Sequence, residues 1–346
     1  MVSFISDDAT YVHLASDYLW ITATTLLGTA LVVPLESALR SVGEAKLPTV
    51  VGIWAILLNA TLNALLIFGL FGFPELGVVG AAIGTAVSRL FQTVLLISIV
   101  YKRHTYLIPT ITNIKQSFER SNLRRYFKIG LPMIIHDAAW AGGILVYNVL
   151  VGQLGVTELA IISLLAPIES VVISAFLGFA VGASVILANE IGAKNYQRVE
   201  RTAWWYVNIS CSLAFVVALL CFIAKPLIFA LLSMTPLSDP TMATNTCLVM
   251  IFGMVLKVFN MVGIGGVLKS GGDINYSIFI DLFGQWAIGI PLAYYTGLVL
   301  GWSLEWVLMI IWLEEIVKIG LTTQRIRSKK WINNLVDDYQ AEPSTT

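Results

Sequence analysis

The sequence predicts an all-α polytopic membrane protein, and its composition and the arrangement of its apolar residues carry that prediction. Hydrophobic residues make up 57% of the 346-residue chain and charged residues only 12%, and the mean hydropathy is +0.82. Soluble domains are about 25% charged, so these few charges could not cover a water-facing surface. The apolar residues also form continuous runs, which favours spanning helices over the alternating strands of a β-barrel.

Nine apolar segments are long enough to cross a membrane, because a spanning helix needs about 20 mostly apolar residues. They cover residues 12–38, 48–71, 77–101, 130–152, 158–189, 202–230, 242–268, 275–299 and 302–324. Cys211, Cys221 and Cys247 lie inside these segments without metal-ligand spacing. We interpret the three cysteines as small buried apolar residues.

The distribution of basic residues predicts the orientation, because Lys and Arg concentrate in cytoplasmic loops. Most of the 21 Lys and Arg residues follow the first, third, fifth, seventh and ninth segments. We therefore expect a multi-pass protein of the plasma (inner) membrane with a cytoplasmic C-terminus. The apolar segments make the lipid bilayer an expected partner. The net charge is zero, and without a basic excess nucleic acid is not an expected partner.

An internal repeat with an offset of 229 residues relates the two ends of the chain. It carries Leu39-Arg40-Ser41-Val42-Gly43-Glu44 onto Leu268-Lys269-Ser270-Gly271-Gly272-Asp273, and Arg89 onto Lys318. Segments one to three thus repeat as segments seven to nine, whereas segments four to six have no upstream partner. Parallel six-helix halves are a known transporter architecture. We therefore expect that three helices are missing from the N-terminal half.

The repeat divides the chain into four expected parts. Residues 1–102 form a partial N-lobe of three helices, and residues 103–128 form a basic cytoplasmic linker. Residues 129–326 form a C-lobe of six helices, and residues 327–346 form a cytoplasmic tail.

Several sequence stretches, in this order and spacing, resemble the multidrug and toxin extrusion (MATE) family. They are ALRSVGEAKLP (38–48), LLNATLNALLIFGLFGFPELGVVGAAIGTAVSR (57–89), YFKIGLP (126–132), NEIGAKNYQRV (189–199) and GVLKSGGDINY (266–276). The resemblance implies a two-lobe bundle of twelve helices, of which the nine here correspond to helices four to twelve. It also implies a monomeric antiporter that needs no cofactor. Such an antiporter exports amphipathic, often cationic, organic compounds by alternating access, coupled to Na⁺ or H⁺.

Two alternatives stay open beside the antiporter. One is a lipid-linked saccharide flippase of the same superfamily, although the few basic residues inside the segments (Arg89, Lys257 and Lys318) make it less favoured. The other is a non-transporting truncated product. The sequence has no phosphate-binding loop, nucleophile elbow or zinc-protease motif, which argues against an enzyme and against ATP-driven transport.

In the N-lobe, the resemblance implies a cation site at Asn59, Asn63 and Thr85. The two asparagines are four residues apart on one helical face, and their amide oxygens suit a hard cation such as Na⁺. We expect this sodium site to be incomplete, because the family's acid would lie on a missing helix. The alternative is that the amides only hold neighbouring helices together.

In the C-lobe, the acids of one family branch have no counterpart, since their positions fall on Trp140 and Val258. His136 and Asp137 stand nearby, shortly after Gly130. A histidine beside an aspartate inside a membrane titrates near neutral pH, which makes this pair a candidate proton site. The alternative is a water-accessible helix entrance with a local ion pair.

Lys257 lies 11 residues before Leu268, which places it about 16 Å into its helix at 1.5 Å per residue. A lysine at that depth needs an acid or a wet cavity. The available partners are Asp281, Glu314, Glu315 and Glu169, and the two neighbouring glutamates could also pair with Lys318. Lys257, Asp281, Glu314 and Glu315 are therefore coupling candidates. Two interpretations stay open, a neutral structural network or a tethered cation whose partner acid is released on protonation.

Aromatic residues deep in the segments could stack on flat cationic substrates. The substrate-cavity candidates are Trp140, Tyr147 and Trp286, together with Glu169 and Asn260. Interfacial belts account equally well for aromatic residues in membrane proteins.

Overall fold

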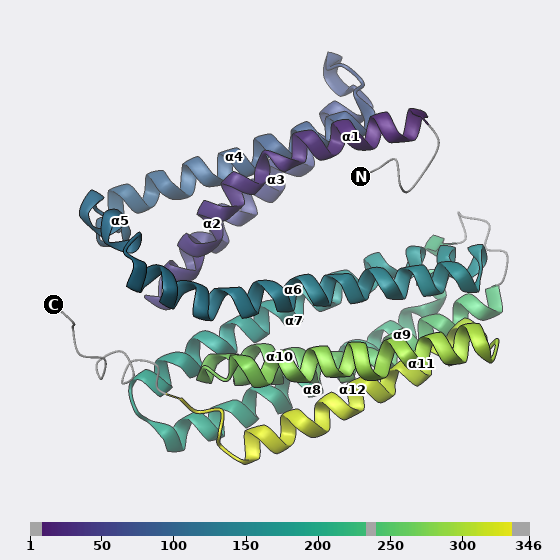
Figure 1. Ribbon diagram of the computed structural model, residues 1–346. Coiled ribbons are helices and arrows are strands. Elements are labelled where there is room, and N and C mark those ends of the chain that lie inside the picture. The colour runs from purple at the N-terminus through teal and green to yellow at the C-terminus, as the bar shows by residue number, and fades with distance from the viewer. Residues whose placement is uncertain (1–8, 233–239, 334–346) are drawn as a thin grey trace. The chain divides into compact units, whose positions relative to one another are not determined.

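The computed structural model describes residues 9–232 and 240–333, and these residues contain helices and no strand (Figure 1). The predicted all-α class is confirmed. The chain divides into two compact units, one up to Asn122 and one from Leu123. This boundary falls inside the predicted linker 103–128, and α6 already begins at Arg120. Residues 334–346 of the predicted tail lie outside the described residues.

The first unit is built on three long helices. Its elements are α1 (Ala9–Ala23), α2 (Thr25–Ser41), α3 (Lys46–Phe68), η2 (Leu70–Gly72), α4 (Gly77–Arg103), η3 (Thr105–Leu107) and α5 (Ile111–Ser117). α3 and α4 lie side by side (Figure 1). A small apolar core of Val32, Leu39, Val51, Leu96 and Val100 joins α2, α3 and α4.

The predicted segment 12–38 is a broken helix. α1 and α2 meet at Thr24 with a bend of 40°. The hydroxyls of Thr22, Thr24 and Thr25 donate to backbone carbonyls three or four residues earlier, at 2.6–2.7 Å. Such bonds compete with the helical ladder and bend helices. The threonine cluster is therefore the physical reason for the break.

The second unit contains the longer helices. Its elements are α6 (Arg120–Leu154), α7 (Val156–Gly192), α8 (Tyr196–Leu232), α9 (Pro240–Asn260), η4 (Met261–Leu268), η5 (Lys269–Gly271), α10 (Ile274–Leu282), η6 (Phe283–Gly289), α11 (Ile290–Tyr294), η7 (Tyr295–Val299) and α12 (Leu304–Arg327). The wide π-helical stretches η4, η6 and η7 interrupt two long helices. The main core packs side chains of α7, α8, α9 and η4 around Val207, Val258 and Leu268.

Seven helical segments among the described residues are long and apolar enough to cross a membrane. They are Lys46–Phe68, Gly77–Arg103, Arg120–Leu154, Val156–Gly192, Tyr196–Leu227, Pro240–Gly271 and Ile274–Val299, and the bent pair α1–α2 adds an eighth. The 24-residue α12 is long enough, but it carries Glu305, Glu314, Glu315 and Lys318. The predicted total of nine spans therefore stays a prediction.

The 229-residue repeat has the same backbone geometry at two glycine turns. Gly43 and Gly272 adopt positive φ angles of 88° and 75°. Each donates its backbone N–H to the carbonyl three residues earlier at 3.1 Å, and the next residue bonds to the carbonyl five residues earlier, at 2.9 and 3.2 Å. Gly72 and Gly301, which the same offset relates, also share positive φ angles of 87° and 66°.

We predict that Gly272→Ala destabilises the protein, because an L-residue in this left-handed conformation costs about 1–2 kcal/mol. The measurement is the melting temperature of the detergent-purified chain, which should fall. Gly320→Ala in α12 is the control, since a Cβ at Gly320 meets open space. An unchanged melting temperature for Gly272→Ala would contradict the prediction.

Candidate functional site

A histidine cluster of Asp137, His136 and Asp281 joins α6 to α10. His136 Nδ1 lies 2.9 Å from Asp137 Oδ1, and His136 Nε2 lies 3.1 Å from Asp281 Oδ2. The His136 side chain is only 7% exposed, whereas that of Asp137 is 74% exposed. The cluster therefore links an accessible carboxylate to one inside the helical unit. The predicted pair gains a partner, Asp281, from another helix.

The geometry of the histidine cluster fits a bound proton. A neutral imidazole donates one hydrogen bond and accepts one, whereas an imidazolium donates two. Both ring nitrogens of His136 face carboxylate oxygens, which are acceptors when ionised. Both contacts become hydrogen bonds only when the imidazole or one carboxyl group carries an extra proton. The cluster is therefore chemically able to take up and release a proton.

A second buried group lies on α12. Lys318 Nζ pairs with Glu314 Oε1 at 2.5 Å, and both side chains are at least 92% buried. The Tyr147 hydroxyl of α6 donates to Glu314 Oε2 at 2.6 Å. Two glycines make room for these side chains, since a Cβ on Gly289 would overlap Glu314 and Tyr147, and one on Gly284 would overlap Lys318. Of the two neighbouring glutamates, Lys318 thus forms its ion pair with Glu314, one helical turn away.

Lys257 of α9 pairs with Glu169 of α7, which is one of the four acids that the sequence offered as partners. Lys257 Nζ lies 2.5 Å from Glu169 Oε1. One turn further along α9, the buried Asn260 donates its amide to Glu315 Oε2 at 2.7 Å and to the Glu315 carbonyl at 3.0 Å. The structure therefore gives each of the acids Glu169, Asp281, Glu314 and Glu315 a different partner on α6, α9 or α12.

Carboxylates outnumber cationic groups away from the helix ends of this unit. Glu169, Asp281, Glu314 and Glu315 stand against Lys257 and Lys318. Even a protonated His136 leaves the acids in excess. Buried charges that lack a partner are costly in an apolar environment. The unit therefore has a physical reason to hold a proton or another cation.

The substrate-cavity candidates fall into two sets. Trp140 and Trp286 are 50% and 44% exposed, and Trp286 Nε1 donates to the carbonyl of Ala139, the residue before Trp140, at 3.2 Å. Their rings can face a ligand. Tyr147 and Asn260, in contrast, use their polar groups on the glutamates of α12. The role of all these residues in binding substrate stays a prediction.

Gln285 is a polar residue that sequence reasoning missed. Its amide nitrogen donates to the Trp140 carbonyl at 3.3 Å, and its buried Oε1 has no hydrogen-bond partner among the described residues. It lies in η6, four residues after Asp281. In the sequence, the feature that could have indicated Gln285 is that it is a lone glutamine in an apolar segment.

In the first unit, Asn59, Asn63 and Thr85 come together between α3 and α4. Asn59 Nδ2 lies 3.4 Å from Thr85 Oγ1, and Asn63 Nδ2 lies 3.3 Å from Asn59 Oδ1. Asn63 Oδ1 is buried and has no hydrogen-bond partner among the described residues. The set offers neutral oxygens only. In the described part of the chain, His, Cys, Asp and Glu side chains form no group of three that could hold a metal.

A cavity of about 210 Å³ lies between α3 and α4, and Asn59 and Thr85 of this set line it. Arg89 lines it and donates to Gln92 Oε1 at 2.9 Å, and Gln92 donates in turn to Glu36 at 3.1 Å. Glu36 also pairs with Arg40 at 3.4 Å. Gln92 connects these groups, although no sequence motif indicates it. The cavity wall thus carries a cation rather than an acid. The lining residues are Gly52, Ala55, Ile56, Asn59, Thr85, Ser88, Arg89 and Gln92.

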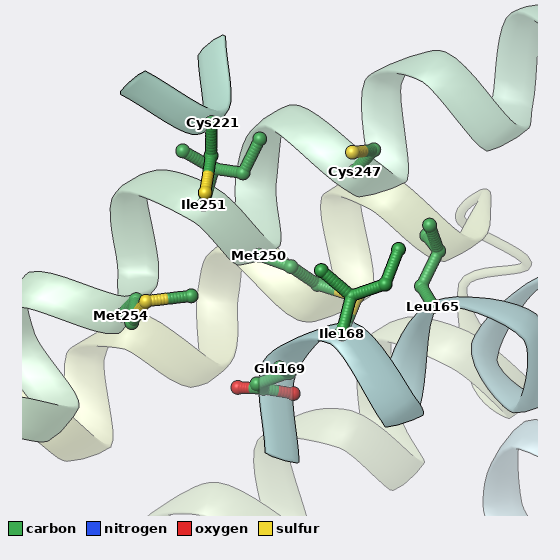
Figure 2. Close-up of a pocket in the computed structure, with 8 residues that line it drawn as sticks. All are labelled: Leu165, Ile168, Glu169, Cys221, Cys247, Met250, Ile251 and Met254. Atoms are coloured by element: carbon green, nitrogen blue, oxygen red, sulfur yellow. The ribbon is translucent and has the colours of Figure 1, made fainter. Parts of the chain in front are cut away.

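A smaller cavity of about 20 Å³ lies between α7, α8 and α9 (Figure 2). Its lining residues are Leu165, Ile168, Glu169, Cys221, Cys247, Met250, Ile251 and Met254. The cysteines are free thiols, and Cys247 is buried whereas Cys211 and Cys221 are half-buried. Glu169 is the one charged residue of the lining, so the acid that binds Lys257 also borders an apolar, sulfur-rich wall.

The MatE family model matches residues 1–65 and 132–295 of this chain. The chain belongs to the MatE family. The resemblance drawn from the sequence motifs is thereby confirmed, and members of this family are secondary transporters, not enzymes.

Named relatives and solved structures agree with this assignment. The uncharacterized transporter YisQ of Bacillus subtilis is 27% identical over 312 residues, which cover 88% of this chain and 66% of YisQ. The probable multidrug resistance protein NorM of Agrobacterium fabrum is 24% identical over 342 residues, 93% of this chain and 73% of NorM. A mutant of the Vibrio cholerae MATE transporter VcmN, 16% identical, superposes with a TM-score of 0.80 over 96% of this chain and 74% of VcmN.

These comparisons confirm the MATE-like fold of a multi-pass membrane protein. The chain spans about two thirds (66%) of the length of several relatives that it matches. What the relatives transport is a property of those proteins.

We predict that Gly289→Ala lowers the free energy of unfolding of this chain, because the new methyl group would displace Glu314 and Tyr147. Overpacking of this kind costs about 1–3 kcal/mol. Thermal unfolding in detergent is the measurement, and Gly178→Ala in α7, where a Cβ meets open space, is the matched control. Equal melting temperatures for the two variants would show that the Tyr147–Glu314 contact does not depend on Gly289.

Proposed function

We propose that this chain is a proton-coupled antiporter that exports amphipathic organic cations. Membership in the MatE family supports a secondary transporter, and the names of several relatives support multidrug export. The observation that carries the choice of the proton is the buried His136, held between two carboxylates from α6 and α10.

The proposed exchange follows from charge balance. The excess of Glu169, Asp281, Glu314 and Glu315 over Lys257 and Lys318 favours one bound cation. This cation is either a proton on the histidine cluster or the organic substrate. When a cationic substrate enters, its charge raises the cost of keeping the extra proton, and the proton leaves. When the proton returns, the substrate is released. Buried acids that exchange a proton for a cation are the physical basis of this scheme.

For the first unit we propose a packing role for Asn59, Asn63 and Thr85. Their oxygens are neutral, and Arg89 lines the adjoining cavity. A sodium ion bound there would gain weak ligands and no compensating negative charge from this set. Amide contacts between membrane helices, in contrast, stabilise a bundle. Sodium coupling at these residues is therefore the less supported alternative.

We further propose that the protein acts as a monomer in the plasma membrane, with a cytoplasmic C-terminus. The basic residues after alternate segments support this orientation. The proposal needs no cofactor, since the proton and the organic cation are the two transported species.

We predict that an imposed pH gradient drives uptake of tetraphenylphosphonium into liposomes that contain the purified chain, and that His136→Ala lowers this uptake at least about tenfold. Loss of the central imidazole separates Asp137 from Asp281 and removes the proton carrier, and general acid–base groups typically contribute about 10²–10⁴-fold where proton transfer is required.

His13→Ala is the matched control, because His13 also pairs with an aspartate, Asp17, but is 78% exposed. Its uptake should equal that of the unsubstituted chain. Uptake driven by a sodium gradient alone, and unchanged in His136→Ala, would refute proton coupling at this cluster.

A further inference from the structure

We propose that Lys257 is a built-in competitor of the substrate, whose ammonium occupies Glu169 in the resting protein and turns to Glu315 when an organic cation binds Glu169. This inference rests on the proposed export of cationic compounds. It assigns the charge-recognition site to Glu169 and gives Lys257 a defined role in regulating access to it.

The exposure of the two side chains fits a displaceable ion pair. Lys257 Nζ lies 2.5 Å from Glu169 Oε1, yet the lysine side chain is 43% exposed and the glutamate 18%. The carboxylate is thus the fixed, better-buried member, and the lysine reaches it from the accessible side. A lysine is a compact charge on a flexible four-carbon chain. A second cation can approach Glu169 along the same side and replace the ammonium.

Glu315 provides the second position for Lys257. Asn260 lies three residues after Lys257, on the same face of the helix, and its amide holds Glu315 Oε2 at 2.7 Å. The displaced ammonium therefore moves from one acid to another and does not remain unpaired. This second acid keeps the cost of displacement low, because breaking a buried pair is costly mainly when one charge is left alone.

The wall around Glu169 fits the apolar body of such a cation. The cavity beside the carboxylate is lined by Met250 and Met254 of α9 and by Cys221 of α8 (Figure 2). Methionine side chains are flexible and polarisable, and they adapt to apolar ligands of different shape. The cavity holds only about 20 Å³, so the thioethers must move to admit a ligand. A carboxylate beside a deformable apolar wall recognises a monovalent amphipathic cation.

Competition by Lys257 has a measurable consequence. A ligand binds more weakly when its site is free in only a fraction of the molecules, and the apparent dissociation constant rises by the inverse of that fraction. If Lys257 occupies Glu169 in about nine of ten molecules, its removal strengthens binding about tenfold. If the ion pair is purely structural and the cation binds elsewhere, removal of Lys257 brings no gain in binding, because its loss only leaves an unpaired buried acid and a less stable helix pair.

The test is equilibrium binding of tetraphenylphosphonium to the purified full chain in detergent. We expect Lys257→Met to bind about tenfold more tightly, which corresponds to about 1.4 kcal/mol. Lys257→Arg keeps the cation and should bind like the unsubstituted chain. Glu169→Gln should lose most of the binding, and Lys257→Met should bring no gain in the Glu169→Gln background.

Glu315→Gln is the second, independent variant, and it retains both Lys257 and Glu169. We expect it to weaken binding several-fold, because the displaced ammonium then has no second acid. Melting temperatures identify any variant that does not fold. If Lys257→Met does not fold, the binding measured for Glu315→Gln decides the proposal.

The outcomes separate this inference from the proposed function. If the unsubstituted chain binds the cation but Lys257→Met binds it equally or more weakly, Lys257 is not a competitor, and the antiporter proposal is unaffected. A gain from Lys257→Met that persists without Glu169 overturns the assignment of Glu169. If the unsubstituted chain neither binds nor transports the cation, the proposed function itself fails.

Discussion

Compensation of charge inside an apolar helical unit is the constraint on which the rest of this structure depends. A charged side chain on a spanning helix is costly unless a partner or water neutralises it. In the unit from Leu123 onward, Lys257 and Lys318 each have an acid at 2.5 Å. Glu169, Asp281, Glu314 and Glu315 still outnumber these two lysines, and the histidine cluster is the place where an extra proton satisfies both neighbouring carboxylates. Helix packing and proposed transport thus have the same electrostatic origin.

The backbone makes these pairings possible at two kinds of position. The π-helical stretch η4 begins directly after Asn260, and η6 begins directly after Leu282, next to Asp281. Such wide turns are frequent at functional sites, because they change which side chains face a neighbouring helix. Gly284 and Gly289 remove the side chains that would block Lys318 and Glu314. Irregular backbone and small residues therefore lie next to the ionisable groups, and η4 also belongs to the main apolar core.

The sequence predicted the helical class, the positions of most long helices and the relation between the two ends of the chain. These features depend on hydropathy and local turn chemistry, which are visible in single segments. The bend at Thr24 was missed, because hydroxyl bonds to the helix backbone do not change the apolar pattern. The total number of spans remained open for a related reason, since the acids of α12 make a packed helix look less apolar.

The types of residue in the site could be predicted from the sequence, but only some of the contacts between their side chains could. His136 with Asp137, and Glu314 with Lys318, are close in sequence and could be anticipated. Asp281 facing His136, and Glu169 facing Lys257, depend on contacts between helices 145 and 88 residues apart. No spacing rule fixes such contacts. Gln285 and Gln92 were overlooked because an isolated amide has no chemistry of its own to recognise in a sequence.

The most direct test of the account counts protons when a cation binds. Calorimetric titration of the purified chain with tetraphenylphosphonium, repeated in buffers with different heats of ionisation, measures the number of protons released per bound cation. We expect release of about one proton, because linkage requires that two mutually exclusive cations displace each other. Binding with no proton released at any pH between about 6 and 8, the range in which histidine titrates, would contradict it.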